Sequence, residues 1–129
     1  MNIDPKQTNA SVLAFMGDAV YEVYIREYVV ERFGQNADRL HKCAIRYVCA
    51  AGQAKACKEM MKGFFTEEEV AIVKRGRNHK TGSRTRSADA VTYKVATGFE
   101  SLIGHLYAEG NERRIREIAY EAIRIIEEE

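Results

Sequence analysis

Asp18 and Glu100 are the two residues whose types and surroundings most favour chemistry. Asp18 lies inside the largely apolar string LAFMGDAVYE, and Glu100 lies inside TGFESLIGHLY, where Phe99 and Leu102 favour burial. An ionised carboxylate in such surroundings is costly unless it gains a cation or strong hydrogen-bond partners. We therefore expect both carboxylates to be buried to some degree and to require a partner.

Small residues accompany both carboxylates, beside them or one helical turn away: Ala14, Gly17, Ala96, Thr97 and Gly104. Helical positions three or four apart share a face, so two helices could approach closely here. If they cross at these points, Asp18 and Glu100 would form a hard-oxygen site. Such a site suits Mg²⁺, which keeps several waters beyond one or two carboxylates.

The same two acids also allow a simpler interpretation. Each could cap a helix, pair with a nearby arginine or face solvent. The histidines do not decide between these alternatives, because His41 and His105 belong to no metal-ligand spacing and are expected to be structural or surface residues. We expect none of the three histidines, including His79, to be catalytic.

Helical periodicity dominates the elements that must position these residues. It predicts helices over about 11–33, about 38–62, from the Thr66 capping box to about Arg75, from about 89 to 109, and after an Asn111 cap. Gly76 is expected to stop the third of these, and 77–87 is expected to form an exposed loop. The sequence contains no strand pattern and no internal repeat, so the predicted fold class is all-α.

Composition fits one small domain. Of the 129 residues, 46% are hydrophobic and 30% are charged, and no apolar run approaches the ~20 residues that span a bilayer. The polar start of the chain carries no signal-peptide segment, so we expect a cytoplasmic protein. Three cysteines, Cys43, Cys49 and Cys57, fall in the second predicted helix and are expected to be reduced packing residues.

Several motifs together resemble a known family of nucleases. The string FMGDAVYE, followed later by TGFESLIG, resembles the two active-site segments of the ribonuclease III catalytic domain. The short form of that family, the Mini-III ribonucleases, is similar over nearly the whole chain. The matching segments, in order, are SVLAFMGDAVYEVYIR, LHK, GQAK, FFTEEE, KRGRN and TYKVATGFESLIG.

The resemblance implies a function that composition does not show. It implies a single ribonuclease III-type endonuclease domain, a helical bundle that forms a homodimer. It further implies an endoribonuclease that hydrolyses both strands of double-stranded RNA with Mg²⁺, for which Mn²⁺ can substitute. The products would carry 5′ phosphates, and the substrate would be a precursor of 23S ribosomal RNA, with assistance from a ribosomal protein left open. Asp18 and Glu100 would be the catalytic metal ligands.

The longer ribonuclease III enzymes carry two further acids where this sequence has Ala14 and Thr97. The Mini-III enzymes are similar to this chain in keeping only the Asp and the Glu. The number of metal ions is therefore left open, with at least one Mg²⁺ expected per site.

A basic segment is the candidate for holding RNA. The net charge is only +1, but 74–86 contains six Lys or Arg residues and no acid. Because no separate RNA-binding domain is expected after the last helix, this loop, about 76–88, would contact the backbone. The candidate residues are Arg75, Arg77, Asn78, Lys80, Arg84 and Arg86. The alternative is a solvated loop with no ligand.

Two competing functions remain beside the nuclease. The first is a non-catalytic RNA-binding or ribosome-assembly module that uses the same basic loop. The second is a helical interaction protein whose acids are only structural.

Overall fold

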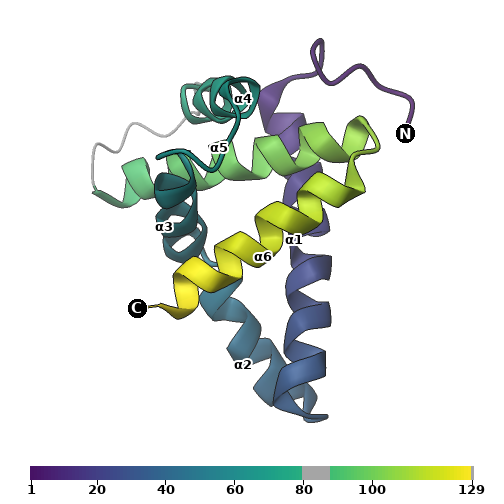
Figure 1. Ribbon diagram of the computed structural model, residues 1–129, viewed down its shortest axis with the longest axis vertical. Coiled ribbons are helices and arrows are strands. Elements are labelled where there is room, and N and C mark those ends of the chain that lie inside the picture. Colours follow the sequence, from purple (N-terminus) through teal and green to yellow (C-terminus); the bar gives the residue numbers. More distant parts are fainter. Residues whose placement is uncertain (80–87, 129) are drawn as a thin grey trace.

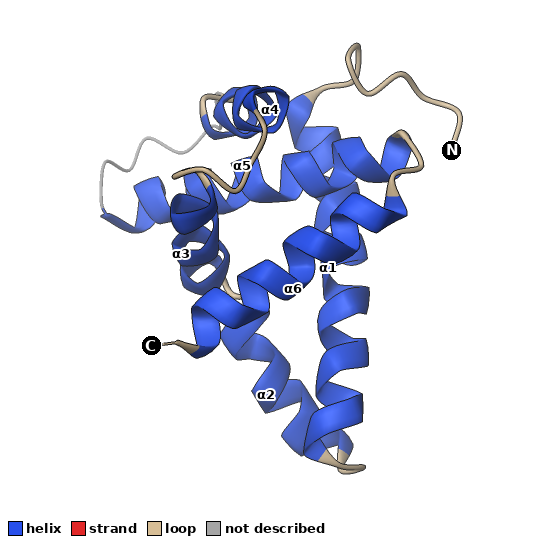
Figure 2. Cartoon of the chain, in the orientation of Figure 1, coloured by secondary structure: helices blue, strands red, loops and turns tan. Residues whose placement is uncertain are grey.

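The computed structural model describes residues 1–79 and 88–128, and within them every regular element is an α-helix (Figure 2). The helices are α1 (Ala10–Phe33), α2 (Ala37–Val48), α3 (Ala50–Met60), α4 (Glu67–Arg77), α5 (Ala88–Ala108) and α6 (Glu112–Glu127). The predicted all-α class is confirmed. No helix in this part of the chain is long and apolar enough to cross a membrane.

Two long helices, α1 and α5, cross at the centre of the molecule (Figure 1). Their contact buries Tyr21 and Ile25 from α1 against Phe99 and Leu102 from α5, and the rings of Tyr21 and Phe99 meet edge to face with centroids 5.0 Å apart. Helices α3, α4 and α6 pack against α5, and α2 packs against α1 and α6. The core therefore lies directly beneath the two helices that carry Asp18 and Glu100.

The prediction of a single helix over about 38–62 is wrong, because the helix is interrupted at Cys49. The backbone of Cys49 is extended, and its Sγ accepts a hydrogen bond from the Gly52 N–H at 3.4 Å as the N-cap of α3. A Cβ atom on Gly52 would lie 2.4 Å from the carbonyl oxygen of Arg46, so this tight turn requires glycine. The cysteines are free, as expected, but they lie on two helices and the turn between them.

The capping box that begins α4 is confirmed, with Thr66 and Glu69 exchanging hydrogen bonds of 2.9 and 3.1 Å. The expected stop at Gly76 is wrong, since α4 continues to Arg77. Gly76 instead lets α4 pack closely on α5, because a Cβ atom there would lie 2.9 Å from the Gly98 Cα atom. Gly76 therefore allows close contact between two helices and does not end α4.

Two carboxylates fasten α6 to the rest of the fold. Glu69 pairs with Arg114 at 2.8 Å, and Glu127 accepts hydrogen bonds from the hydroxyls of Tyr28 and Tyr47 at 2.5 and 2.8 Å. Burial alone would raise the pKa of Glu127, but these hydroxyls and nearby arginines lower it below its usual value. The end of α6 is thereby fixed to α1 and α2.

Candidate active site

The backbones of α1 and α5 touch where the candidate carboxylates lie. A Cβ atom on Gly17 would be 1.8 Å from the carbonyl oxygen of Glu100, and one on Gly104 would be 1.9 Å from the carbonyl oxygen of Leu13. No side chain fits at either position. The close approach expected from the small residues is therefore present, and it places Asp18, the residue after Gly17, beside Glu100.

The carboxylate of Asp18 lies close enough to that of Glu100 to affect its ionisation. Burial, followed by the proximity and negative charge of Asp18, raises the pKa of Glu100 to about 8, while the nearby Gln53 amide opposes the rise. The expected burial is correct only for Glu100, which is half-buried. Asp18 is exposed, because its face of α1 opens into a cleft.

The cleft has a volume of about 460 Å³ and is walled by four parts of the chain. Its lining comes from α1 (Ser11, Ala14, Phe15, Asp18), the α2–α3 junction (Val48, Ala50, Gln53), the end of α4 (His79) and α5 (Tyr93, Ala96, Thr97, Glu100). Ala14 and Thr97 both line this space. Their small side chains leave room beside the two carboxylates.

Gln53 is the site residue that sequence reasoning missed. The residue is 1% exposed, its side chain donates a hydrogen bond to the carbonyl oxygen of Val48 at 3.1 Å, and its proximity lowers the pKa of Glu100. The available signal was an amide within an otherwise apolar helical stripe. Gln53 reaches Glu100 only because the break at Cys49 gives α3 its own direction.

The donor set fits a hard divalent cation. Two adjacent carboxylates and an amide side chain offer oxygen ligands, and the raised pKa of Glu100 reflects repulsion that a bound cation would relieve. The oxygen donors of this pair favour a hard divalent cation over softer metals.

The structure describes half of the candidate RNA-binding residues. Arg75 is exposed on α4 and donates a hydrogen bond to the Thr8 carbonyl, Arg77 is half-buried, and Asn78 is exposed at the end of α4. Lys80, Arg84 and Arg86 lie outside the described residues. His79 connects the described part of this segment to the cleft.

Comparisons with known proteins find similar proteins over nearly the whole chain. The ribonuclease III domain matches residues 11–111. Mini-ribonuclease 3 of Brevibacillus brevis is 46% identical over 98% of this chain and 93% of the relative, and that of Enterococcus faecalis is 45% identical over 89% and 88%. A crystal structure of a Fusobacterium nucleatum protein, 34% identical, has a TM-score of 0.79 and covers 94% of this chain and 96% of that one.

An all-helical domain with this match and this pair of carboxylates is an endoribonuclease of the ribonuclease III type. The chain belongs to the ribonuclease III family, and within it the similarity to proteins named Mini-ribonuclease 3 extends over nearly the entire sequence. The resemblance that the motifs gave is confirmed.

The helix crossing can be tested at Gly17. Replacing Gly17 by Ala should lower the free energy of unfolding by about 3 kcal/mol, because the added methyl group overlaps the backbone of Glu100. For a domain of this size the melting temperature should fall by about 10 °C, measured by circular dichroism. If the site had free space, the better helix propensity of alanine would instead raise the melting temperature.

Proposed function

We propose that this protein cleaves double-stranded RNA with Mg²⁺ held by Asp18 and Glu100, and that its substrate is a precursor of 23S ribosomal RNA. The observation that carries the proposal is the meeting of these two carboxylates in an open cleft on two helices that are fixed by glycine contacts. The similarity to Mini-ribonuclease 3 supports the substrate class.

Asp18 and Glu100 have different surroundings and therefore different proposed roles. Asp18, exposed in the cleft, can reach the ion and the RNA, while half-buried Glu100 is held in place by Gln53. Bound Mg²⁺ supplies charge neutralisation at the scissile phosphate and lowers the pKa of a coordinated water. Hydrolysis breaks the bond from phosphorus to the 3′ oxygen, so the products carry a 5′ phosphate and a 3′ hydroxyl. Mn²⁺ satisfies the same oxygen ligands.

The carboxylates can be tested with Asp18→Asn and Glu100→Gln. Each should lower the rate of cleavage of long double-stranded RNA by at least about a hundredfold, while folding and RNA binding persist. Stability should not fall and can rise, because each change removes repulsion between the acids. Cleavage by the unchanged protein should stop in EDTA and return with Mg²⁺, as measured by gel electrophoresis.

Glu22→Gln is the matched control, since Glu22 lies one turn beyond Asp18 and pairs with Arg26. Its activity should stay near that of the unchanged protein. RNA binding without metal-dependent fragments would reject the enzyme and favour the non-catalytic RNA-binding module.

A second copy of the chain is the proposed partner of α1. The outward side of this helix carries an apolar stripe that the rest of the described chain leaves uncovered, made of Val12, Phe15, Ala19, Val23 and Val30. Phe15 is 81% exposed and lies at the edge of the cleft. Pairing of two such stripes would cover them and place two sites across one dimer, one for each RNA strand.

The dimer can be tested with Phe15→Glu. A charge at this position should weaken self-association by at least about tenfold, because it would be desolvated in the interface. Sedimentation equilibrium measures the change. Ile45→Glu, which alters an exposed apolar residue on α2, is the control. A dimer unaffected by Phe15→Glu would move the interface away from this stripe.

The basic segment is the proposed contact with the RNA backbone, and two of its described residues, Arg75 and Asn78, are exposed near His79 at the cleft. Arg84→Ala combined with Arg86→Ala should weaken binding of double-stranded RNA. The slope of log affinity against log salt should become shallower by up to about 2, since fewer counterions are released. The pair Arg39→Ala and Lys42→Ala on α2 is the control, and an unchanged slope for Arg84 and Arg86 would exclude them from the interface.

A further inference from the structure

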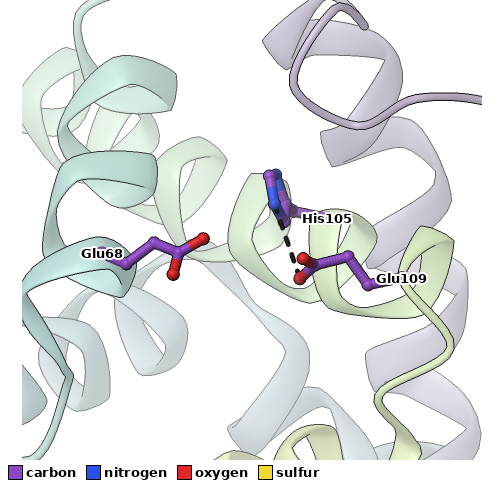
Figure 3. A group of neighbouring side chains, drawn as sticks. All are labelled: Glu68, His105 and Glu109. Carbon is purple, nitrogen blue, oxygen red and sulfur yellow. Dashed lines mark ion pairs between the residues drawn. The ribbon is translucent and has the colours of Figure 1, made fainter.

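A second group of metal-ligating side chains lies away from the catalytic cleft, where the start of α4 meets the end of α5. Glu68 from α4, His105 from α5 and Glu109 from the turn directly after α5 each place one ligand atom within 4.8 Å of the others. Figure 3 shows the Glu68 carboxylate pointing across from α4 toward the other two side chains. These residues are not used by the proposed nuclease chemistry.

His105 is the observation that needs an explanation. Its side chain is 3% exposed, and neither ring nitrogen has a hydrogen-bond partner among the described residues. A buried imidazole without partners is unfavourable, because its polar atoms have lost water without compensation. The His105 Nε2 atom instead faces the Glu109 carboxylate, whose Oε1 lies 3.5 Å away (Figure 3).

That separation fits two ligands of one ion. Zn²⁺ binds imidazole nitrogen and carboxylate oxygen at about 2.0–2.2 Å, so two ligands of a tetrahedral ion lie about 3.4 Å apart. His105 and Glu109 are four residues apart, and the Glu109 N–H donates to the His105 carbonyl oxygen at 3.1 Å, which holds both ligands on the same side. Glu68 supplies the third ligand from another helix, and water can complete the coordination.

The surrounding charges leave these ligands available. The neighbouring cleft, of about 500 Å³, is lined by four carboxylates and two guanidiniums: Glu68, Glu69, Glu109, Glu117, Arg113 and Arg114. Arg114 pairs with Glu69 at 2.8 Å and with Glu117 at 3.2 Å, and Arg113 lies 4.0 Å from Glu117. Both arginines are thus engaged by Glu69 and Glu117 rather than by Glu68 or Glu109.

We propose that Glu68, His105 and Glu109 bind a Zn²⁺-type transition-metal ion that is distinct from the catalytic Mg²⁺. The imidazole ligand gives the two sites different metal preferences, because Mg²⁺ prefers oxygen ligands alone and transition metals accept nitrogen. The ion joins the first turn of α4 to the last turn of α5. It therefore stabilises the packing of the helix that leads into the basic segment.

A titration of the full-length, reduced protein with Zn²⁺ in excess Mg²⁺ tests this site directly. In ¹⁵N NMR of the histidine rings, the signals of His105 should shift and saturate as Zn²⁺ is added. His41, exposed on α2, should stay unchanged and is the internal reference. An unchanged His105, or equal shifts of His105 and His41, would overturn the proposal.

Exposed carboxylates provide variants that should remain folded. Glu68→Gln and Glu109→Gln should each lower the Zn²⁺ affinity, measured by calorimetry, by at least about tenfold. Zn²⁺ should also raise the melting temperature of the unchanged protein more than that of either variant. Glu67→Gln, the exposed neighbour in the same turn of α4, should behave as the unchanged protein does.

Equal Zn²⁺ affinity in the unchanged protein and in Glu68→Gln and Glu109→Gln would reject this ligand set. None of these measurements uses RNA cleavage. Failure of the zinc site is therefore distinguishable from failure of the proposed nuclease.

Discussion

The contact between the backbones of α1 and α5 at Gly17 and Gly104 is the constraint on which the site depends. Two carboxylates on different helices can meet only if the helices approach closely, and a single methyl group at either glycine would collide with a carbonyl oxygen. The core beneath the contact, with Tyr21 packed edge to face on Phe99, holds the crossing in place. The position of Asp18 relative to Glu100 is therefore fixed by backbone geometry as much as by side-chain packing.

That contact brings together two groups that repel one another once ionised. Burial and the charge of Asp18 raise the pKa of Glu100 to about 8, so the fold favours a proton on Glu100 at neutral pH. As pH rises from the ordinary pKa of a glutamate through this value, ionisation of Glu100 progressively destabilises the fold. A bound divalent cation would instead stabilise the fold, because it replaces the proton and is attracted to both carboxylates. The repulsion that destabilises the fold without an ion therefore goes together with affinity for a cation.

Local signals made most of the fold predictable from the sequence. The capping box at Thr66, the Asn111 cap and the glycines that follow α1 and α5 act through their own backbone neighbourhoods, and each marks an element that the structure contains. The break at Cys49 has no such signal, because the residue that requires it, Gly52, acts through contact with the Arg46 carbonyl. Gly76 was wrongly predicted to end α4 for a similar reason, because its small size allows α4 to pack closely on α5.

The same distinction explains which parts of the site could be predicted. Asp18 and Glu100 were recognisable from their apolar surroundings, their small neighbours and the resemblance of their motifs. Gln53 depends on the direction of α3 after the break, and the burial of His105 depends on the packing of α5 among other helices. These are tertiary properties that a periodic pattern does not encode.

The composition of α1 follows from the several surfaces that this one helix must serve. An ordinary surface helix has one apolar stripe and a polar face, but α1 carries apolar residues on nearly every side. Its inner face, with Leu13 and Ile25, is buried in the core, and its outer face, with Phe15 and Val23, is exposed in one chain. In the proposed dimer both faces are covered, and Asp18 lies between them at the cleft. The helix that carries the candidate catalytic acid is then held from two sides, which explains why apolar residues occur on nearly every side of it.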